Sequence, residues 1–394
     1  MFSRWTAGPS DLTHRKGLPA PNPCDLGHEL RWPIADPIIL EGPGAPVYSF
    51  FPIAPQPQMP RMLRVRDGLQ DGLGRGITYL RVSVTEQCNL ACVYCKPRTG
   101  VLQRTEAPAM SRNEVVQLVK VFASLGIRKV RLTGGEPLMR RDLETIIAGI
   151  SPEVEGRVHL TTNGIHLARR ARALRDAGLS GVNVSLDAAD RGTFERLTLK
   201  NGLDKVLAGL EAARGVGLKA KLNTVVLRGW NDDQIVPLAR LAQREGFQVR
   251  FIEFMPYLGN GWDSARFMPA SEILQTVQEG LGIDLEEEPA VGLEEGPARL
   301  FRIPRSSGKV GVISTLSADF CDRCNRVRLT SRGELKTCLF GHQPIDLLEP
   351  LRNHASHEDV AQLIRQALSE KLDCHPMRQG DTPNLAQGMW QVGG

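Results

Sequence analysis

Six of the eight cysteines are spaced like metal ligands. They form a first and a second cysteine group, which are Cys88, Cys92 and Cys95, and Cys321, Cys324 and Cys338. The first group has the pattern CxxxCxxC, and the second is a CxxC pair followed by a third thiol after thirteen residues. A structural zinc site takes four ligands, and a disulfide framework takes an even number of cysteines in a secreted chain. Each group therefore indicates a metal centre that the chain leaves open on one side.

Iron–sulfur chemistry suits such an open centre. A cubane cluster normally takes four thiolates, so three thiolates leave one iron free to bind another molecule. A zinc site or a four-thiolate electron-transfer cluster is the alternative. For the second group, a fourth ligand from the chain has several candidates: Cys374, His342, His354, His357 and His375.

A repeating strand–helix pattern must position the first group. Six β-branched runs predict strands, at residues 79–85, 129–134, 157–162, 181–187, 219–227 and 248–255. Helices are expected after most of them, such as residues 111–126, where Ser111 and Glu114 form a capping box. This alternation predicts a parallel sheet with right-handed crossovers. Because a closed barrel has eight such units, we expect an open, partial (β/α)6 barrel.

Polar motifs follow the predicted strands. "GGEP" follows the second strand and "TTNG" the third, while Ser185 and Asp187 end the fourth. Lys221 and Asn223 lie in the fifth strand, and Met255 ends the sixth. In parallel α/β folds the carboxyl ends of the strands carry the active site, so these motifs predict one extended pocket beside the first cysteine group.

The chain divides into three predicted regions. Residues 1–65 are rich in Pro and Gly and read as a poorly ordered extension. Residues 66–270 form the partial barrel. Residues 271–394 form a smaller α+β domain, which holds the second cysteine group and covers the open barrel. Helices are expected there at residues 271–282 and 358–371, and strands at residues 300–304 and 309–315.

Composition limits the function classes. A net charge of +5 without blocks of like charge argues against a nucleic-acid partner. No apolar run reaches the roughly 20 residues of a membrane span, and the amino terminus has no apolar secretion signal. We therefore expect a cytoplasmic protein, in which cysteines serve metal or redox chemistry. A few basic residues near the amino terminus leave organelle targeting open.

CxxxCxxC after the first strand, with "GGEP" after the second, resembles the radical S-adenosylmethionine superfamily. The resemblance implies a [4Fe-4S] cluster on the first group, whose free iron binds S-adenosylmethionine and cleaves it to a 5′-deoxyadenosyl radical. It also implies contacts with this cofactor, by matching positions, from Tyr94, Gly134, Gly135, Glu136, Ser185 and Met255.

A second three-cysteine group in the same chain resembles the GTP 3′,8-cyclase family, also known as molybdenum cofactor biosynthesis protein A. The resemblance runs from about Asp71 to Gly394 and includes "RLTGGEPLMRRDL", "RFIEFMP", "CNRVR" and the terminal Gly-Gly. It implies a second [4Fe-4S] cluster whose free iron binds guanine. The residues implied for GTP are Arg81, Arg131, Thr161, Lys221, Arg326, Val327 and Arg328. Lys129 and Arg250 are further candidates, and no Walker-type phosphate loop is present.

In this family the radical takes hydrogen from C3′ of the GTP ribose, and the carbon radical attacks C8 of guanine. The product is (8S)-3′,8-cyclo-7,8-dihydro-GTP, made in the first step of molybdenum cofactor biosynthesis. Catalytic roles are implied for Arg326 and Arg328, with Gly393 and Gly394 as a tail that enters the pocket and positions an arginine. The resemblance also implies a separate electron donor, a next enzyme that receives the product, and a homodimer as an option.

Two features depart from the family pattern. Lys96 stands where the family commonly has Met, and the long amino-terminal extension is unusual for a bacterial form. Two other functions therefore stay open. One is a radical enzyme with an auxiliary cluster that acts on peptides, and the other is a non-catalytic metal- or nucleic-acid-binding protein that holds zinc.

Overall fold

The structure, a computed structural model, describes residues 68–95, 109–155, 157–257, 259–289, 296–341, 344–376 and 388–393. All of them belong to one compact unit, residues 61–394. The predicted extension, Lys96, His342 and Gly394 lie outside the described residues.

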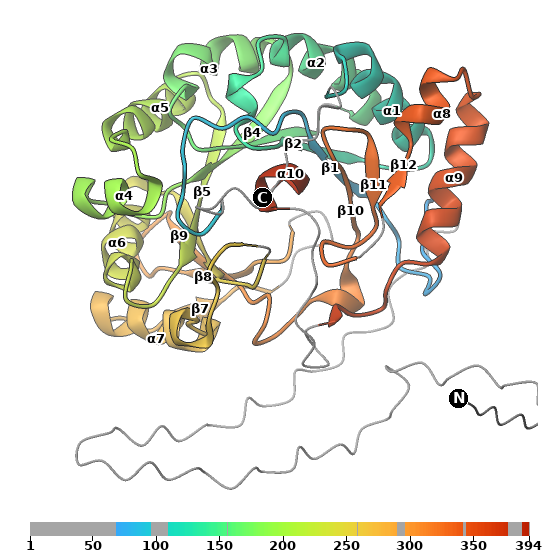
Figure 1. Cartoon of the computed structure of the whole chain (residues 1–394). Helices are drawn as coiled ribbons and strands as arrows, with labels where there is room; N and C mark the ends of the chain where they lie inside the picture. Colours follow the sequence, from blue (N-terminus) through green and yellow to red (C-terminus); the bar gives the residue numbers. More distant parts are fainter. Residues whose placement is uncertain are drawn as a thin grey trace, which may run out of the picture. The chain divides into compact units, whose positions relative to one another are not determined.

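Six parallel strands form the centre of one curved sheet (Figure 1). They are β1 (Tyr79–Ser83), β2 (Lys129–Thr133), β3 (Val158–Thr162), β4 (Leu179–Ser185), β5 (Lys219–Val226) and β6 (Gln248–Glu253). They lie side by side in chain order, and each neighbouring pair is parallel. All six overlap the runs that the sequence predicts, and the partial-barrel fold class is confirmed.

Helices cover the outer face of this sheet (Figure 1). They are α1 (Arg112–Ser124), α2 (Leu143–Ile150), α3 (Leu167–Asp176), α4 (Arg191–Thr198), α5 (Leu203–Gly215), α6 (Ile235–Glu245) and α7 (Ala270–Leu281). The expected capping box is present, because the Ser111 and Glu114 side chains each accept from the other's backbone N–H. In the described part of the chain, no helix has both the length and the apolar character to cross a bilayer.

Carboxyl-terminal strands extend the sheet at both edges. At one edge β9 (Lys309–Ile313) pairs parallel with β6, followed by β8 (Arg299–Arg302) and β7 (Glu286–Glu287). At the other edge β10 (Arg326–Leu329) pairs parallel with β1, followed by β11 (Glu334–Lys336) and β12 (Ile345–Asp346). The result is one 12-stranded sheet. The predicted boundary at residue 270 therefore falls inside one continuous sheet, and two separate domains stay a prediction.

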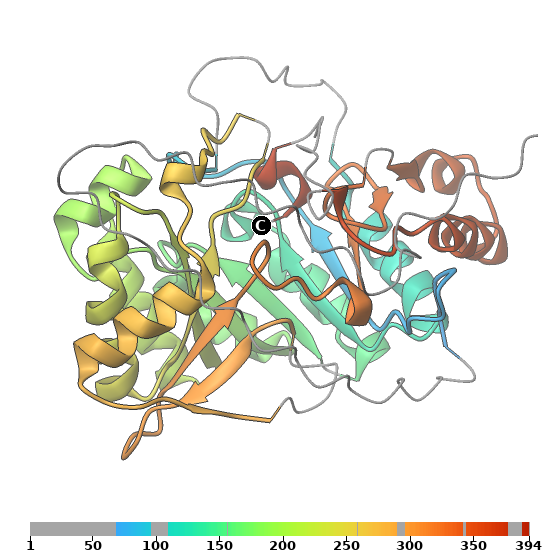
Figure 2. The ribbon, with the colours of Figure 1, turned by 90° about the horizontal axis from the view of Figure 1, so that it is seen from below.

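The remaining helices are α8 (Leu348–Arg352), α9 (His357–Ser369) and α10 (Met389–Val392). Figure 2 shows α8 and α9, in red, on one flank of the molecule and the orange strands β8 and β9 on the other. Helix α10 lies inside the ring formed by the outer helices (Figure 1). The carbonyls of Val392 and Gly393 at its end accept from Arg328 of β10, and the expected entry of the Gly-Gly tail into the pocket stays a prediction.

Alternation along the strands separates an apolar face from a polar one. Leu80 and Val82 of β1 and Val130 and Leu132 of β2 lie in the hydrophobic core, with exposures of 0%. Successive strand residues point to opposite faces, so the residues between them face the barrel interior. These interior residues carry the polar groups of the candidate site.

Candidate active site

Basic side chains line the interior face of three neighbouring strands. Arg81 of β1 pairs in register with Arg131 of β2 and with Arg328 of β10. Two residues earlier, Tyr79 pairs with Lys129 and Arg326, and its hydroxyl accepts a hydrogen bond from Arg131. Arginine is rarely buried unless paired. Arg131 and Arg328 are only 5% and 9% exposed, so this group of cations suits a buried anion.

Each of these buried cations disfavours the charged form of its neighbours. Burial first, and then Arg328, lower the pKa of Arg81 well below its usual value. Burial and Arg326 bring the pKa of Arg328 to about 10, and burial and Arg131 bring that of Arg250 to about 9. Two effects lower these values, the loss of solvent and the nearby like charge. A bound polyanion would offset both.

The polar surface continues across the rest of the sheet. Thr161 of β3, Asn183 of β4 and Lys221 of β5 lie at one level of the register. At the next level Ser185 of β4 pairs with Asn223, which pairs with Arg250 of β6. The strands therefore bring the expected GTP residues Thr161 and Lys221 and the expected cofactor residue Ser185 to the same interior face as the arginines.

Several buried polar atoms on this face have no hydrogen-bond partner within the described part of the chain. They are Ser83 Oγ, Thr161 Oγ1, Asn223 Oδ1, Tyr257 OH, and Arg250 Nε and Nη2. Buried polar groups in proteins are nearly always paired. Five unpaired groups facing one interior therefore indicate a polar ligand there.

The glycines of "GGEP" hold the loop that carries the first cysteine group. The backbone N–H groups of Gly135 and Glu136 donate to the carbonyls of Thr85 and Gln87, each at 2.7 Å. A Cβ on Gly134 would lie 2.3 Å from the Thr85 oxygen, and Gly134 has a φ of +146° that side chains rarely adopt. Glycine is therefore required where the second loop packs on the first.

The thiols of the first group act on one another electrostatically. Burial raises the pKa of Cys92 well above its usual value, and Cys95, Asp187 and Cys88 add to this effect. The Asn163 side-chain amide of the "TTNG" motif lies 3.9 Å from Cys88 Sγ, to which it donates. Three thiols that repel one another when they are ionised fit a cationic iron centre between them.

Tyr94 fastens this loop to the end of β4. Its hydroxyl donates to Asp187 Oδ2 at 2.5 Å, and the other oxygen of Asp187 accepts from the Val225 backbone at 2.8 Å. Burial is the main reason why the pKa of Asp187 rises to about 6. The expected contact of Tyr94 with adenine is therefore open to its ring and backbone, while its hydroxyl is engaged.

Glu136 occupies a structural position. Its carboxylate is 1% exposed and accepts hydrogen bonds from the Leu138 backbone, the Thr162 hydroxyl and the Asn163 backbone. Burial outweighs these bonds and raises its pKa to about 7. The expected contacts of Gly134, Gly135 and Glu136 with the cofactor's amino end stay predictions.

Met255 packs near the second cysteine group. It contacts a small apolar cluster of Tyr257, Phe340 and Val392, against which Cys338 also packs. This position joins the end of β6 to the carboxyl-terminal segment. The expected contact of Met255 with adenine stays a prediction.

The second cysteine group lies in the segment around β10. Burial, and then Asp319 and the other two thiols, raise the pKa of Cys321 to about 12. Burial also raises the pKa of Cys324, but Arg326 and Lys371 outweigh it and bring the value to about 7. The second group therefore has cations close to one of its thiols.

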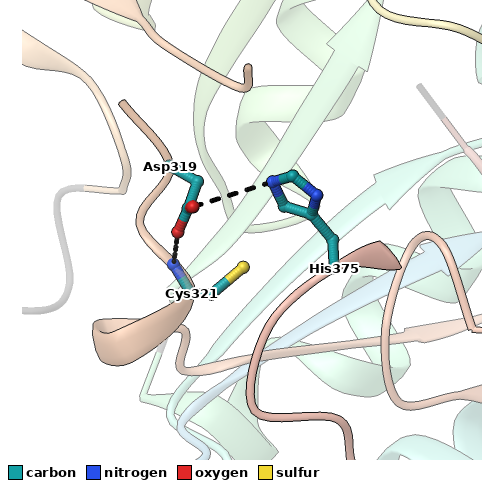
Figure 3. A group of neighbouring side chains, drawn as sticks. All are labelled: Asp319, Cys321 and His375. Carbon is teal, nitrogen blue, oxygen red and sulfur yellow. Dashed lines mark hydrogen bonds and ion pairs between the residues drawn. The ribbon is translucent and has the colours of Figure 1, made fainter. Parts of the chain in front are cut away.

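One candidate fourth ligand lies beside Cys321 (Figure 3). A ring nitrogen of His375, a carboxylate oxygen of Asp319 and Cys321 Sγ lie within 4.8 Å of one another. Asp319 also accepts from the Cys321 backbone at 3.0 Å, and its other oxygen lies 3.9 Å from His375 Nε2. Among the other candidates, His357 contacts Ser124 of α1 instead.

The carboxyl-terminal tail contacts the interior arginines. Arg328 Nη1 donates to the carbonyls of Val392 and Gly393. A Cβ on Gly393 would lie 2.3 Å from Thr133 Cγ2, and its φ is +78°. Glycine is therefore needed where the tail passes β2 to reach Arg328. Val327, by contrast, has its side chain in the hydrophobic core, and its expected contact with GTP stays a prediction.

Three further residues contact the cysteine groups or the segments that carry them, and the sequence did not predict these contacts. Asn163 contacts a thiol of the first group, and Lys371 contacts one of the second. Arg75 donates to the carbonyls of Cys321, Leu372 and Asp373. The "TTNG" motif pointed to the region of Asn163, whereas the sequence carries no comparable signal for Lys371 or Arg75.

A partial barrel whose first loop carries three thiols defines the class of radical S-adenosylmethionine enzymes. Residues 82–242 match the family model of the radical SAM superfamily. The fold is similar to that of SuiB from Streptococcus suis, solved with S-adenosylmethionine bound. That likeness has a TM-score of 0.53 at 14% identity and covers 78% of this chain and 76% of SuiB.

The remaining comparisons identify the family within this class. Residues 247–377 match the family model Molybdenum Cofactor Synthesis C. The chain is 40% identical over 331 residues to GTP 3′,8-cyclase of Pelotomaculum thermopropionicum, covering 83% of this chain and 100% of that protein. It is 37% identical to molybdenum cofactor biosynthesis protein 1 of Drosophila melanogaster, covering 83% of this chain and 57% of that protein. The chain belongs to the GTP 3′,8-cyclase family.

Proposed function

We propose that the chain converts GTP to (8S)-3′,8-cyclo-7,8-dihydro-GTP in molybdenum cofactor biosynthesis. Membership of the family supports this activity. The observation that carries it is the group of interior arginines, Arg81, Arg131 and Arg328, on the adjacent strands β1, β2 and β10. The proposal places the protein in the cytoplasm and includes an electron donor, a following enzyme that takes the product and, as an option, a homodimer.

The first cysteine group would hold the cluster that binds S-adenosylmethionine. When bound, the cluster and S-adenosylmethionine together supply a carbon radical that takes hydrogen from C3′ of the ribose. The chain's contribution is to hold the loop rigidly, through the Gly134 and Gly135 packing and the bond from Tyr94 to Asp187. Rigid placement matters because the radical must reach one C–H bond and no other.

The interior cations would hold the triphosphate. Arginine pairs bidentately with phosphate oxygens, and Arg250 has two buried nitrogens that no described residue accepts from. Lys221 and Thr161 face the same interior from β5 and β3. The second cysteine group would hold a cluster whose free iron takes the guanine base, so the ribose would lie between the two metal centres.

The tail would orient Arg328. The carbonyl of Gly393 accepts from its guanidinium, which leaves the other nitrogens of Arg328 to face the nucleotide. The contact between Arg328 and Gly393 supports the catalytic roles proposed for these two residues, and those of Arg326 and Gly394 are proposed from the family resemblance. In the reaction, the aminyl radical left on guanine takes up one electron and one proton, so the product is an isomer of GTP.

Deuterium transfer tests this proposal. The chain is reconstituted with iron and sulfide without oxygen and incubated with S-adenosylmethionine, a reductant and GTP deuterated at C3′. We expect 5′-deoxyadenosine that carries one deuterium and a chromatographically distinct isomer of GTP. Cofactor cleavage without deuterium transfer would contradict the proposal, and transfer from a peptide would support the peptide-acting alternative.

His375 supports a different second centre. If the imidazole beside Cys321 completes the coordination, the second site holds zinc or a closed cluster and GTP cannot bind its metal. The variant His375→Ala separates the two cases. If one iron of the second cluster is open, the variant should keep its metal, and GTP should still change the spectrum of the cluster. If His375 closes the site, the variant should lose the metal.

A further inference from the structure

Lys371 is buried at the second cysteine group, just after α9. It is 5% exposed, and its ammonium lies 3.8 Å from Cys324 Sγ. The same ammonium donates to the carbonyl of Arg326, at 3.3 Å, and to that of Thr337. Arg326 follows the CxxC pair by two residues, and Thr337 precedes Cys338. One ammonium therefore connects the two chain segments that carry the three thiols.

The charge of this lysine has no carboxylate partner among the described residues. Burying an unpaired ammonium is costly, and two carbonyl groups offset only part of that cost. The sulfur of Cys324 is the remaining partner, and it carries negative charge only as a thiolate. The position of Lys371 is therefore best explained by a metal-bound thiolate beside it.

A second cation fixes the segment that follows Lys371. Arg75 is 8% exposed and forms an ion pair with Asp71 at 2.6 Å. Its other nitrogens donate to the carbonyls of Leu372 at 2.6 Å, and of Asp373 and Cys321 at 2.8 Å. The backbone next to Lys371 is thereby tied to the CxxC pair, so the ammonium cannot easily move away.

We propose that Lys371 is a positioning residue of the second cluster, which holds the Cys324 thiolate and raises the reduction potential of that cluster. The inference rests on the proposed second cluster. Reduction adds negative charge to a cluster, and a fixed cation nearby stabilises the reduced form. The first cysteine group has a neutral amide, that of Asn163, at the corresponding contact with Cys88.

The test uses the full-length chain with Cys92→Ala, so that the second cluster alone reports. Lys371→Met removes the charge at similar size, and Lys371→Arg keeps it. Lys120→Met is the matched control, because Lys120 is exposed and contacts Glu153 far from any thiol. Two quantities are measured for each variant. They are the iron content per chain and the midpoint potential of the cluster, which is monitored by electron paramagnetic resonance. We expect a lower midpoint potential only in Lys371→Met, with recovery toward the parent value in Lys371→Arg.

The other outcomes of this experiment either support or overturn the proposed role of Lys371. An unchanged potential in Lys371→Met at full iron content would overturn the inference. If Lys371→Met loses the cluster, denaturant unfolding of the metal-free protein decides. Unchanged stability, with iron restored by Lys371→Arg, supports the inference, whereas equal destabilisation by both variants assigns Lys371 to the fold alone. Absence of iron from the parent itself would contradict the second cluster and the proposed function.

Discussion

The two cysteine groups have the same number of thiols but differ in the charged and polar groups beside one thiol of each, Cys92 in the first group and Cys324 in the second. Beside the first group lie the neutral amide of Asn163 and the acidic Asp187, and the pKa of Cys92 is raised well above its usual value by burial and by neighbouring negative groups. Beside Cys324 lie Lys371 and Arg326, which bring its pKa to about 7 against the effect of burial.

This difference suits two different tasks. A cluster with fewer positive charges around it is reduced at a lower potential, which makes it a stronger reductant, as cofactor cleavage requires. A cluster with charge compensation is more easily reduced and suits the binding of a nucleotide in a cationic site. We therefore expect the first cluster to be reduced at the lower potential of the two.

Removing one thiol from each group should give the largest effects. Cys92→Ser should abolish cofactor cleavage altogether, because the first cluster is lost. Cys324→Ser should abolish formation of the cyclised nucleotide but leave cofactor cleavage without GTP largely intact. Cys24→Ala is the control, since Cys24 belongs to neither group and is not a candidate ligand of either. The measurement is 5′-deoxyadenosine formed with and without GTP, and equal loss in both serine variants would contradict the division of tasks.

Arg250→Met should affect binding and stability in opposite directions. Loss of a phosphate partner should weaken GTP binding by about 10- to 100-fold, in line with about 1.5–3 kcal/mol for a charged hydrogen bond. The metal-free protein should become more stable by about 1–3 kcal/mol, because a buried unpaired cation is removed. Calorimetry and denaturant unfolding measure the two effects, and a destabilised protein would show that Arg250 has a partner after all.

Glu136 should make stability depend on pH. Its pKa is raised from 4.5 to about 7 in the folded protein, so the folded state favours the protonated acid. The contribution of Glu136 to the unfolding free energy is fully present below pH 4.5. It is lost as the pH rises to about 7, and the loss is on the order of 3 kcal/mol. Glu136→Gln should remove this slope from the unfolding free energy of the metal-free protein.

The control for this experiment is Glu153→Gln, which changes a partly exposed carboxylate in the same way. The slope that Glu136→Gln removes should remain in this variant. The Asp187 contribution, which extends to its own pKa of about 6, should remain in all three proteins. An identical slope in Glu136→Gln and the parent would refute the assignment.

Tyr94→Phe should give the smallest effect. It removes the hydrogen bond to Asp187 and should lower the stability by about 1–2 kcal/mol and the cofactor affinity a few-fold. Tyr257→Phe is a matched control, because the Tyr257 hydroxyl is buried without a hydrogen-bond partner among the described residues. That variant should be no less stable than the parent in thermal unfolding. Equal effects of both substitutions would exclude a special role for the Tyr94 contact.

Much of the barrel follows from local patterns in the sequence. Leu80 and Val82 alternate with Tyr79 and Arg81, so the apolar face predicts that Arg81 points inward. The capping box of Ser111 and Glu114 predicts where α1 begins. In both cases the interaction that decides the structure lies within a few residues of the chain.

Long-range pairing explains what the sequence did not predict. The segment Arg326–Leu329 is short and half basic, and only its pairing with β1 places Arg328 opposite Arg81. Lys371 lies just after a surface helix, where a lysine normally contacts solvent, and its contact with Cys324 spans 47 residues. The "CNRVR" motif marks Arg328 but not its place opposite Arg81, and no local pattern marks Lys371, because the partner of each is brought in by the fold.

Electron paramagnetic resonance of the reduced protein, with both clusters present, tests the central claim most directly. GTP and S-adenosylmethionine are added separately to the same sample. We predict two cluster signals, of which GTP changes only that of the second group and S-adenosylmethionine only that of the first. A single signal, with zinc bound in place of the second cluster and no response to GTP, would contradict the account.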